Sequence, residues 1–218
     1  MKDVSTSTNK KIWILLLIMG PVSVFFYLLH VVLGGILWKD YSHITQAVSD
    51  LTADGAPDQK LLSIFTTIYG ILAIVFSITL FLCWKKKVVT IVRIGLISFI
   101  VMEVCSLVGY SMFPLSDGGI EMNFQNIMHI VVTAVVVIAT ILAMYLTGIG
   151  LLHKAEFQKL GTITLCCAVI ITLSGFGTGF IAGTGLPIMG LVERINIFTL
   201  QFWVVVLSVY ALRLKLKL

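Results

Sequence analysis

The sequence that decides the fold is residues 124–151, FQNIMHIVVTAVVVIATILAMYLTGIGL. This stretch contains no Asp, Glu, Lys or Arg, and it is longer than the roughly 20 residues that a helix needs to cross a bilayer. Other apolar runs of similar length surround it, and none shows the alternation of a transmembrane β-strand. The sequence therefore predicts one all-α, polytopic membrane domain over residues 1–218, a six-helix bundle with spans at 12–38, 61–84, 91–112, 124–151, 160–183 and 187–212.

The composition supports a membrane protein. Of the 218 residues, 59% are hydrophobic and only 11% are charged, and the mean hydropathy is +1.08. A soluble chain of this size could not bury so much apolar surface, because much of any folded surface faces its solvent. The composition thus argues against a soluble enzyme, a nucleic-acid-binding factor and a disordered chain.

The positive charges indicate the orientation of the spans. Most Lys and Arg residues lie in segments 2–11, 85–93, 154–159 and 213–217, which the six spans place on one side. Cytoplasmic segments of membrane proteins carry this excess. Both termini should therefore be cytoplasmic, in a bacterial plasma membrane. The net charge of +5 then reflects topology, and no nucleic-acid partner is expected.

The longest connection, residues 39–60, reads KDYSHITQAVSDLTADGAPDQK and lies on the outer side of this topology. Its apolar residues Ile44, Val48 and Leu51 recur at helical spacing, and Asp54-Gly55 followed by Pro57 is a stop signal. This pattern predicts a short amphipathic helix at the membrane interface. The segment would serve either as a cap on the bundle or as a lid over an outward cavity.

Ionisable side chains fall at one depth in four of the spans. Counted at about 1.5 Å per residue from the outer boundaries, they lie roughly 8–13 Å inside the membrane. Such residues are costly in lipid and usually have a partner or a function. They share helical faces with other polar residues, so we expect an outward-opening polar pocket, with the 39–60 segment above it. The candidate lining residues are His30, Ser49, Asp50, Glu103, Ser106, Tyr110, Asn126, His129, Glu193, Arg194 and Asn196.

Several chemistries remain open for these residues. Arg194 could form a buried ion pair with Glu103, or it could receive a phosphate or carboxylate headgroup. His30 and His129 are weak candidates for metal ligands, with Glu103 or Asp50 as a third ligand. Ser49-Asp50 and Ser116-Asp117 lack the surroundings of a nucleophile elbow. No Walker loop, dinucleotide-binding glycine pattern or haem-attachment motif occurs, and no cofactor is expected.

Glycines and cysteines carry a structural signal. Gly175, Gly179 and Gly183 repeat every four residues in the fifth span, a pattern that lets helix backbones approach closely. Packing inside the bundle is the first interpretation, with homodimerisation or substrate passage as alternatives. Gly20-Pro21 predicts a kink in the first span. All four cysteines lie in spans, so an outer disulfide is not expected.

The outer segments resemble a known family. Tyr41-Ser42, Val48-Ser49-Asp50-Leu51 and Gly55-Ala56-Pro57 are similar to the signature of a six-helix family of bacterial and archaeal membrane proteins, domain of unknown function 998. Phe113-Pro114, His129 and Glu193-Arg194 resemble its other recurring points. Members often read SDLGA or SELGA where this chain has Ser49-Asp50-Leu51-Thr52-Ala53. The resemblance implies a fold and a location, but no reaction.

Three functions follow as hypotheses. The first is a protein that binds or translocates an amphiphilic or lipid-like ligand, with Arg194 and His129 facing an anion and Glu103 as counter-ion or proton carrier. Membrane lipids or an amphiphilic small molecule would then be its partners. The second is an intramembrane metal-dependent hydrolase or transferase. The third is a structural or accessory subunit. The sequence favours the first narrowly and leaves enzymatic activity and oligomeric state open.

Overall fold

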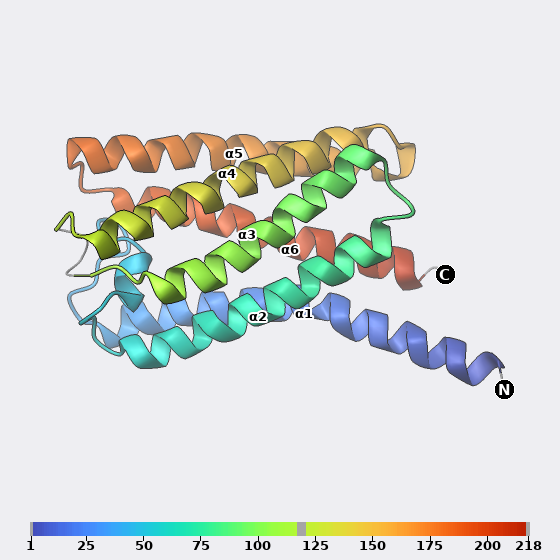
Figure 1. Ribbon diagram of the computed structural model, residues 1–218, viewed down its shortest axis with the longest axis horizontal. Coiled ribbons are helices and arrows are strands. Elements are labelled where there is room, and N and C mark those ends of the chain that lie inside the picture. The colour runs from blue at the N-terminus through green and yellow to red at the C-terminus, as the bar shows by residue number, and fades with distance from the viewer. Residues whose placement is uncertain (1, 117–120, 217–218) are drawn as a thin grey trace.

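The computed structural model describes residues 2–116 and 121–216 and consists of long helices joined by short connections (Figure 1). No strand occurs in these residues. The helices are α1 (Lys2–Leu37), α2 (Gln59–Trp84), α3 (Thr90–Met112), α4 (Phe124–Leu152), α5 (Gln158–Thr184) and α6 (Met189–Leu216), with short 3-10 helices η1 (Ser49–Thr52) and η3 (Ala155–Phe157).

All six long helices of the described residues are long and apolar enough to cross a membrane. The six predicted spans are confirmed within a few residues, because an uninterrupted apolar run of this length has no stable alternative to a helix in lipid. The chain is therefore a multi-pass membrane protein.

The helices form a ring in which each packs against the next and α6 packs against α1. The two termini lie at the same end of the bundle (Figure 1). We call this the terminal end. The opposite end, which carries residues 38–58, 113–116, 121–123 and 185–188, is the loop end. Pro21 lies within α1, and this helix changes direction near its middle, as the sequence predicted (Figure 1).

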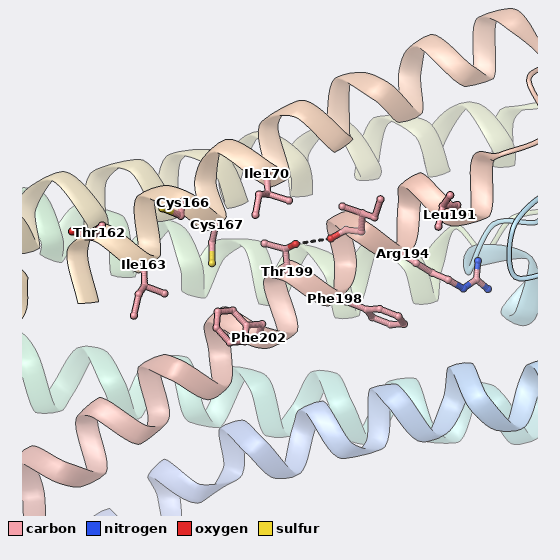
Figure 2. Close-up of a pocket in the computed structure, with 11 residues that line it drawn as sticks. Thr162, Ile163, Cys166, Cys167, Ile170, Leu191, Arg194, Phe198, Thr199 and Phe202 are labelled. Carbon is pink, nitrogen blue, oxygen red and sulfur yellow. Dashed lines mark hydrogen bonds between the residues drawn. The ribbon is translucent and has the colours of Figure 1, made fainter. Parts of the chain in front are cut away.

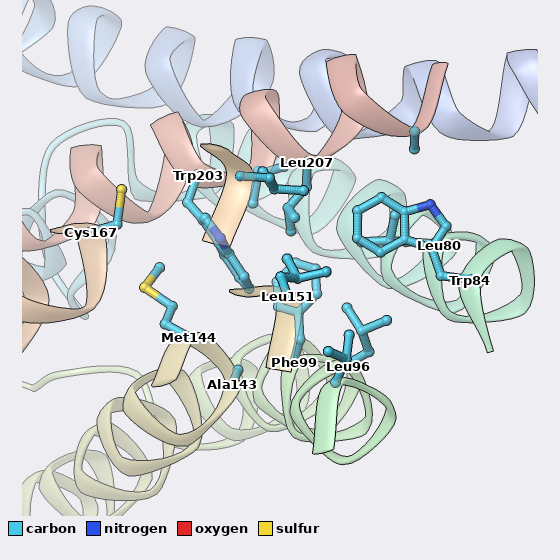
Figure 3. Close-up of a cluster of buried hydrophobic side chains, with 14 of the residues drawn as sticks. Leu80, Trp84, Leu96, Phe99, Ala143, Met144, Leu151, Cys167, Trp203 and Leu207 are labelled. Carbon is cyan, nitrogen blue, oxygen red and sulfur yellow. The ribbon is translucent and has the colours of Figure 1, made fainter. Parts of the chain in front are cut away.

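Two apolar cores fill the ring. The larger core contains Trp84, Phe99, Met144 and Trp203 from four different helices (Figure 3). The smaller core lies at the loop end and includes Val31, Tyr41, Val48, Leu51 and Leu62. The 38–58 connection thus contributes side chains to the interior and closes the loop end of the bundle.

The prediction of an amphipathic helix in this connection is wrong. Residues 38–58 form turns and only the short η1 helix, and Ile44 is exposed while Val48 and Leu51 are buried. An α-helix needs its own backbone groups for hydrogen bonds. Here the carbonyl oxygens of His43, Ile44 and Gln46 instead accept bonds from α6. Asp117, named above beside Ser116, lies outside the described residues.

The glycine stripe of α5 does not pack as expected. A Cβ atom added to Gly179 or Gly183 would meet no atom of the described chain within 4 Å, and one added to Gly175 would make only ordinary contacts. Close helix approaches occur elsewhere, for example at Gly95, where a Cβ would lie 2.8 Å from the Thr147 backbone nitrogen. Homodimerisation therefore remains an untested role for the α5 stripe.

Candidate functional site

The first turns of α6 hold the 38–58 connection in place. Glu193 accepts a hydrogen bond of 2.5 Å from the Val48 backbone N–H. The next residue, Arg194, donates to the carbonyl oxygens of His43 (2.7 Å) and Gln46 (3.0 Å). It also donates to the Tyr41 hydroxyl at 2.5 Å. We call Tyr41, Glu193 and Arg194 the loop-end clamp.

Arg194 is a buried cation that binds neutral groups. The nitrogen that contacts His43 and Gln46 also lies 2.9 Å from the Gly190 carbonyl oxygen, while Nε has no partner among the described residues. The guanidinium lies 5.4 Å from the centre of the Tyr41 ring. The ion pair with Glu103, one of the two alternatives for Arg194, does not form, since both Glu103 oxygens lack a partner among the described residues. Carbonyl oxygens and an aromatic face stabilise the positive charge instead.

The clamp also shapes the ionisation of the connection. Burial raises the pKa of the Tyr41 hydroxyl to about 12 although Arg194 acts in the opposite direction. The hydroxyl therefore stays protonated at neutral pH and donates to the Ala47 carbonyl at 2.6 Å. Burial likewise raises the pKa of Asp50, whose carboxylate accepts a bond from the Ala47 N–H, and this bond and Arg194 partly counter the shift.

Two predicted pocket residues tie down the other long connection. Asn126 is buried, and its side chain bonds the backbone N–H and carbonyl of Ser116 and the carbonyl of Glu121. His129 Nδ1 lies 2.8 Å from the Phe113 carbonyl oxygen. The two connections also meet, because the Asp54 N–H donates to the Leu115 carbonyl at 2.7 Å. The side chains of Asn126 and His129 thus hold the backbone of this connection at the loop end.

A polar layer lies between the two apolar cores. We define this buried polar layer as Tyr27, His30, Tyr69, Glu103 and Gln201, from four helices. The rings of Tyr27 and His30 are 5.5 Å apart, and those of Tyr27 and Tyr69 are 4.9 Å apart. Gln201 donates to the Tyr69 hydroxyl at 3.2 Å.

A groove runs between α5 and α6 on the outside of the bundle (Figure 2). It has a volume of about 760 Å³ and is almost entirely apolar. Cys166, Ile170, Ile195, Phe198 and Phe202 are among its lining residues, and Arg194 stands at its loop end with the guanidinium turned toward the 38–58 connection (Figure 2).

Two polar ties join α5 and α6 on the buried side of the groove. The Trp203 indole N–H donates to the Thr164 hydroxyl at 3.0 Å, and the Asn196 amide donates to the Ile171 carbonyl at 2.9 Å. These bonds hold the helices together while their outer faces leave space. Asn196, predicted as a pocket residue, is therefore an interhelical tie.

The sequence was compared with known proteins. Residues 21–210 match the family described as Protein of unknown function (DUF998). The chain belongs to this family. No curated protein and no solved structure matches the chain. The DUF998 match begins within α1 and ends within α6, so it includes the clamp, the buried polar layer and the groove.

The structure brings the other predicted residues of this DUF998 chain into different environments. His30 and Glu103 share the buried polar layer, while Ser49 and Asp50 belong to the clamped connection. Tyr110 packs on the His129 ring at 5.0 Å and donates to Thr133, and Ser106 is half-buried one turn from Glu103. Within the described residues, no group of three or more His, Cys, Asp or Glu side chains is placed to hold a metal ion, so His30 and His129 are not joined in one.

Sequence reasoning missed Tyr69 and Gln201 in the layer and Tyr41 in the clamp. Gln201 is a lone amide within the sixth apolar span, and such a group in lipid needs a partner. That signal could have placed it beside the other polar residues. Tyr41 lies in a connection, where the sequence gives no hint of a contact with α6.

Proposed function

We propose that this protein binds an amphiphilic, lipid-like molecule whose apolar chain occupies the groove between α5 and α6. The apolar groove itself is the observation that carries the proposal. It is open to the side, where acyl chains of the bilayer can enter without crossing water. An apolar concave surface with a few polar groups at one end is typical of ligand sites.

The shape of the groove supports a chain-like ligand. From Leu191 to Phe202 it follows α6 for about 17 Å, which is more than half of the roughly 30 Å hydrocarbon thickness. The α5 residues Thr162 to Ile170 continue it toward the terminal end. A ligand chain would thus run along the membrane normal, and its headgroup would lie near Arg194.

The charge at the loop end supports an anionic headgroup. Arg194 lines the loop end of the groove and has no carboxylate hydrogen-bonded to it among the described residues. We further propose that the loop end faces the outside of the plasma membrane and that both termini are cytoplasmic, as the positive-inside rule requires. The headgroup would then lie in the outer leaflet.

Filling the groove tests this proposal. Ile195→Trp should occupy the space and lower the amount of lipid that co-purifies with the protein or is labelled by a photoactivatable phospholipid. The matched control is Ile97→Trp on α3, because Ile97 is 47% exposed and Ile195 is 45% exposed. Equal lipid retention and labelling in both variants and the wild type would contradict a site in the groove.

A further inference from the structure

Three side chains of the buried polar layer have polar atoms without partners. Both oxygens of Glu103, both ring nitrogens of His30 and the amide oxygen of Gln201 make no hydrogen bond with the described residues. Their side chains are hidden from solvent, at 0% exposure for Glu103, 2% for His30 and 3% for Gln201. Buried polar groups in proteins are nearly always paired, so such a cluster requires an explanation.

The surroundings of Glu103 disfavour a charged carboxylate. A buried charge without a counter-ion or hydrogen bonds is very costly, and the group becomes neutral instead. Arg194, the cation considered above as its partner, is bound to the 38–58 connection instead. The described titratable groups on the surrounding helices at this height are Tyr27 and His30 of α1, Tyr69 of α2, Tyr110 of α3, His129 of α4 and Glu193 of α6.

The layer lies deep enough to be separated from both membrane surfaces. At 1.5 Å per residue, Tyr27, Tyr69 and Glu103 lie about 14–15 Å from the loop ends of their helices. The smaller core and the clamped connection cover them on the loop side, and the larger core lies on the terminal side. The clamped connection therefore lies between the layer and the water at the loop end.

We propose that Glu103 is a proton-binding site whose exchange with water is controlled by the loop-end clamp. In the closed structure Glu103 carries the proton as a neutral acid. When the 38–58 connection opens, the O–H bond of Glu103 breaks, its proton passes to entering water, and a solvated carboxylate remains. Closure reverses the transfer. His30 and Gln201 supply the open acceptors that hold water beside the acid during exchange.

Infrared spectroscopy of the protein in lipid bilayers tests the site. At neutral pH the wild type should show the carbonyl stretch of a protonated carboxylic acid, and Glu103→Gln should lack it. Glu121→Gln and Glu156→Gln change exposed carboxylates outside the clamp, are the matched controls and should retain it. Glu103→Asp keeps a carboxyl at this position and should shift the band, which covers the case in which Glu103→Gln fails to fold.

Transfer to heavy water tests the control by the clamp. The band should shift slowly in the wild type, and faster in Arg194→Lys, which retains the charge but not the forked contacts. Three results would overturn the proton site. The first is a carbonyl band that survives Glu103→Gln, and the second is a neutral-pH spectrum with only ionised carboxylates. The third is a carboxylate signal that depends on sodium. An unchanged exchange rate in Arg194→Lys would overturn the control by the clamp.

Discussion

Arg194 shows how one residue can determine the structure of a distant connection. Its guanidinium holds Tyr41, His43 and Gln46, more than 140 positions earlier in the chain. The planar fork of Arg allows several directed bonds at once, which the single ammonium of Lys cannot reproduce. The residue therefore acts through geometry as much as through charge.

Replacing Arg194 by Lys should loosen the 38–58 connection. Each hydrogen bond to a charged group contributes roughly 1.5–3 kcal/mol, so the loss of one raises the open population about tenfold or more. Hydrogen–deuterium exchange of peptides over residues 41–51 measures this change. Arg93→Lys is the control, because Arg93 is exposed and its side chain bonds only Thr90 among the described residues. Equal exchange in both variants would show that Arg194 does not hold the connection.

Asp50 should make the stability of the connection depend on pH. Burial raises its pKa above the ordinary value of 3.8 in the folded state. As pH rises from that value, the unfolded carboxyl ionises first, and stability falls until the folded carboxyl has ionised as well. Between mildly acidic and neutral pH, the melting temperature should therefore change less with pH in Asp50→Asn than in the wild type. Parallel curves of melting temperature against pH for the two proteins would contradict this expectation.

At the scale of elements, glycines matter where backbones meet. Gly190, in the first turn of α6, lies under the 38–58 connection, and an added Cβ would overlap the Gln46 carbonyl oxygen and come within 2.8 Å of the His43 carbonyl oxygen. A Cβ added to Gly179 of α5 would meet no atom of the described residues within 4 Å. The two glycines therefore have opposite roles, although both lie in apolar helices.

Gly190→Ala should destabilise the protein, and Gly179→Ala should not. The first variant forces the connection away from α6, while the second gains about 0.5–1 kcal/mol of helix propensity. Thermal unfolding of the two variants in the same detergent provides the comparison. A stable Gly190→Ala protein would show that the connection can rest elsewhere. A destabilised Gly179→Ala protein would indicate that α5 contacts a second molecule.

At the scale of the whole molecule, the orientation is open to direct measurement. Asp58→Cys places a thiol at the loop end, and Glu156→Cys places one at the terminal end; both positions are exposed. If the termini are cytoplasmic, a membrane-impermeant thiol reagent should label the first in intact cells and the second only after permeabilisation. The wild type supplies the background from its four native cysteines. The reverse labelling pattern would contradict the proposed topology.

The sequence predicted the six helices well because the length and polarity of an apolar run suffice to define a span in lipid. It did not predict the shape of residues 38–58, since the bond between Glu193 and Val48 joins positions 145 apart. Of the two alternatives that it left open for Arg194, the ion pair with Glu103 does not form, because both Glu103 oxygens lack a partner among the described residues. The groove was not foreseen either, because it depends on how two helices separate.

The ring of helices closes where α6 packs against α1. α1 and α6 are neighbours, the Ser208 hydroxyl binds the Leu17 carbonyl at 2.8 Å, and the Lys215 ammonium lies 5.3 Å from the centre of the Trp13 ring. A short peptide could therefore join the end of α6 to the beginning of α1, with new termini opened between α2 and α3. Such a circular permutant keeps every helix contact and changes only the order in which the translation machinery delivers the spans to the bilayer.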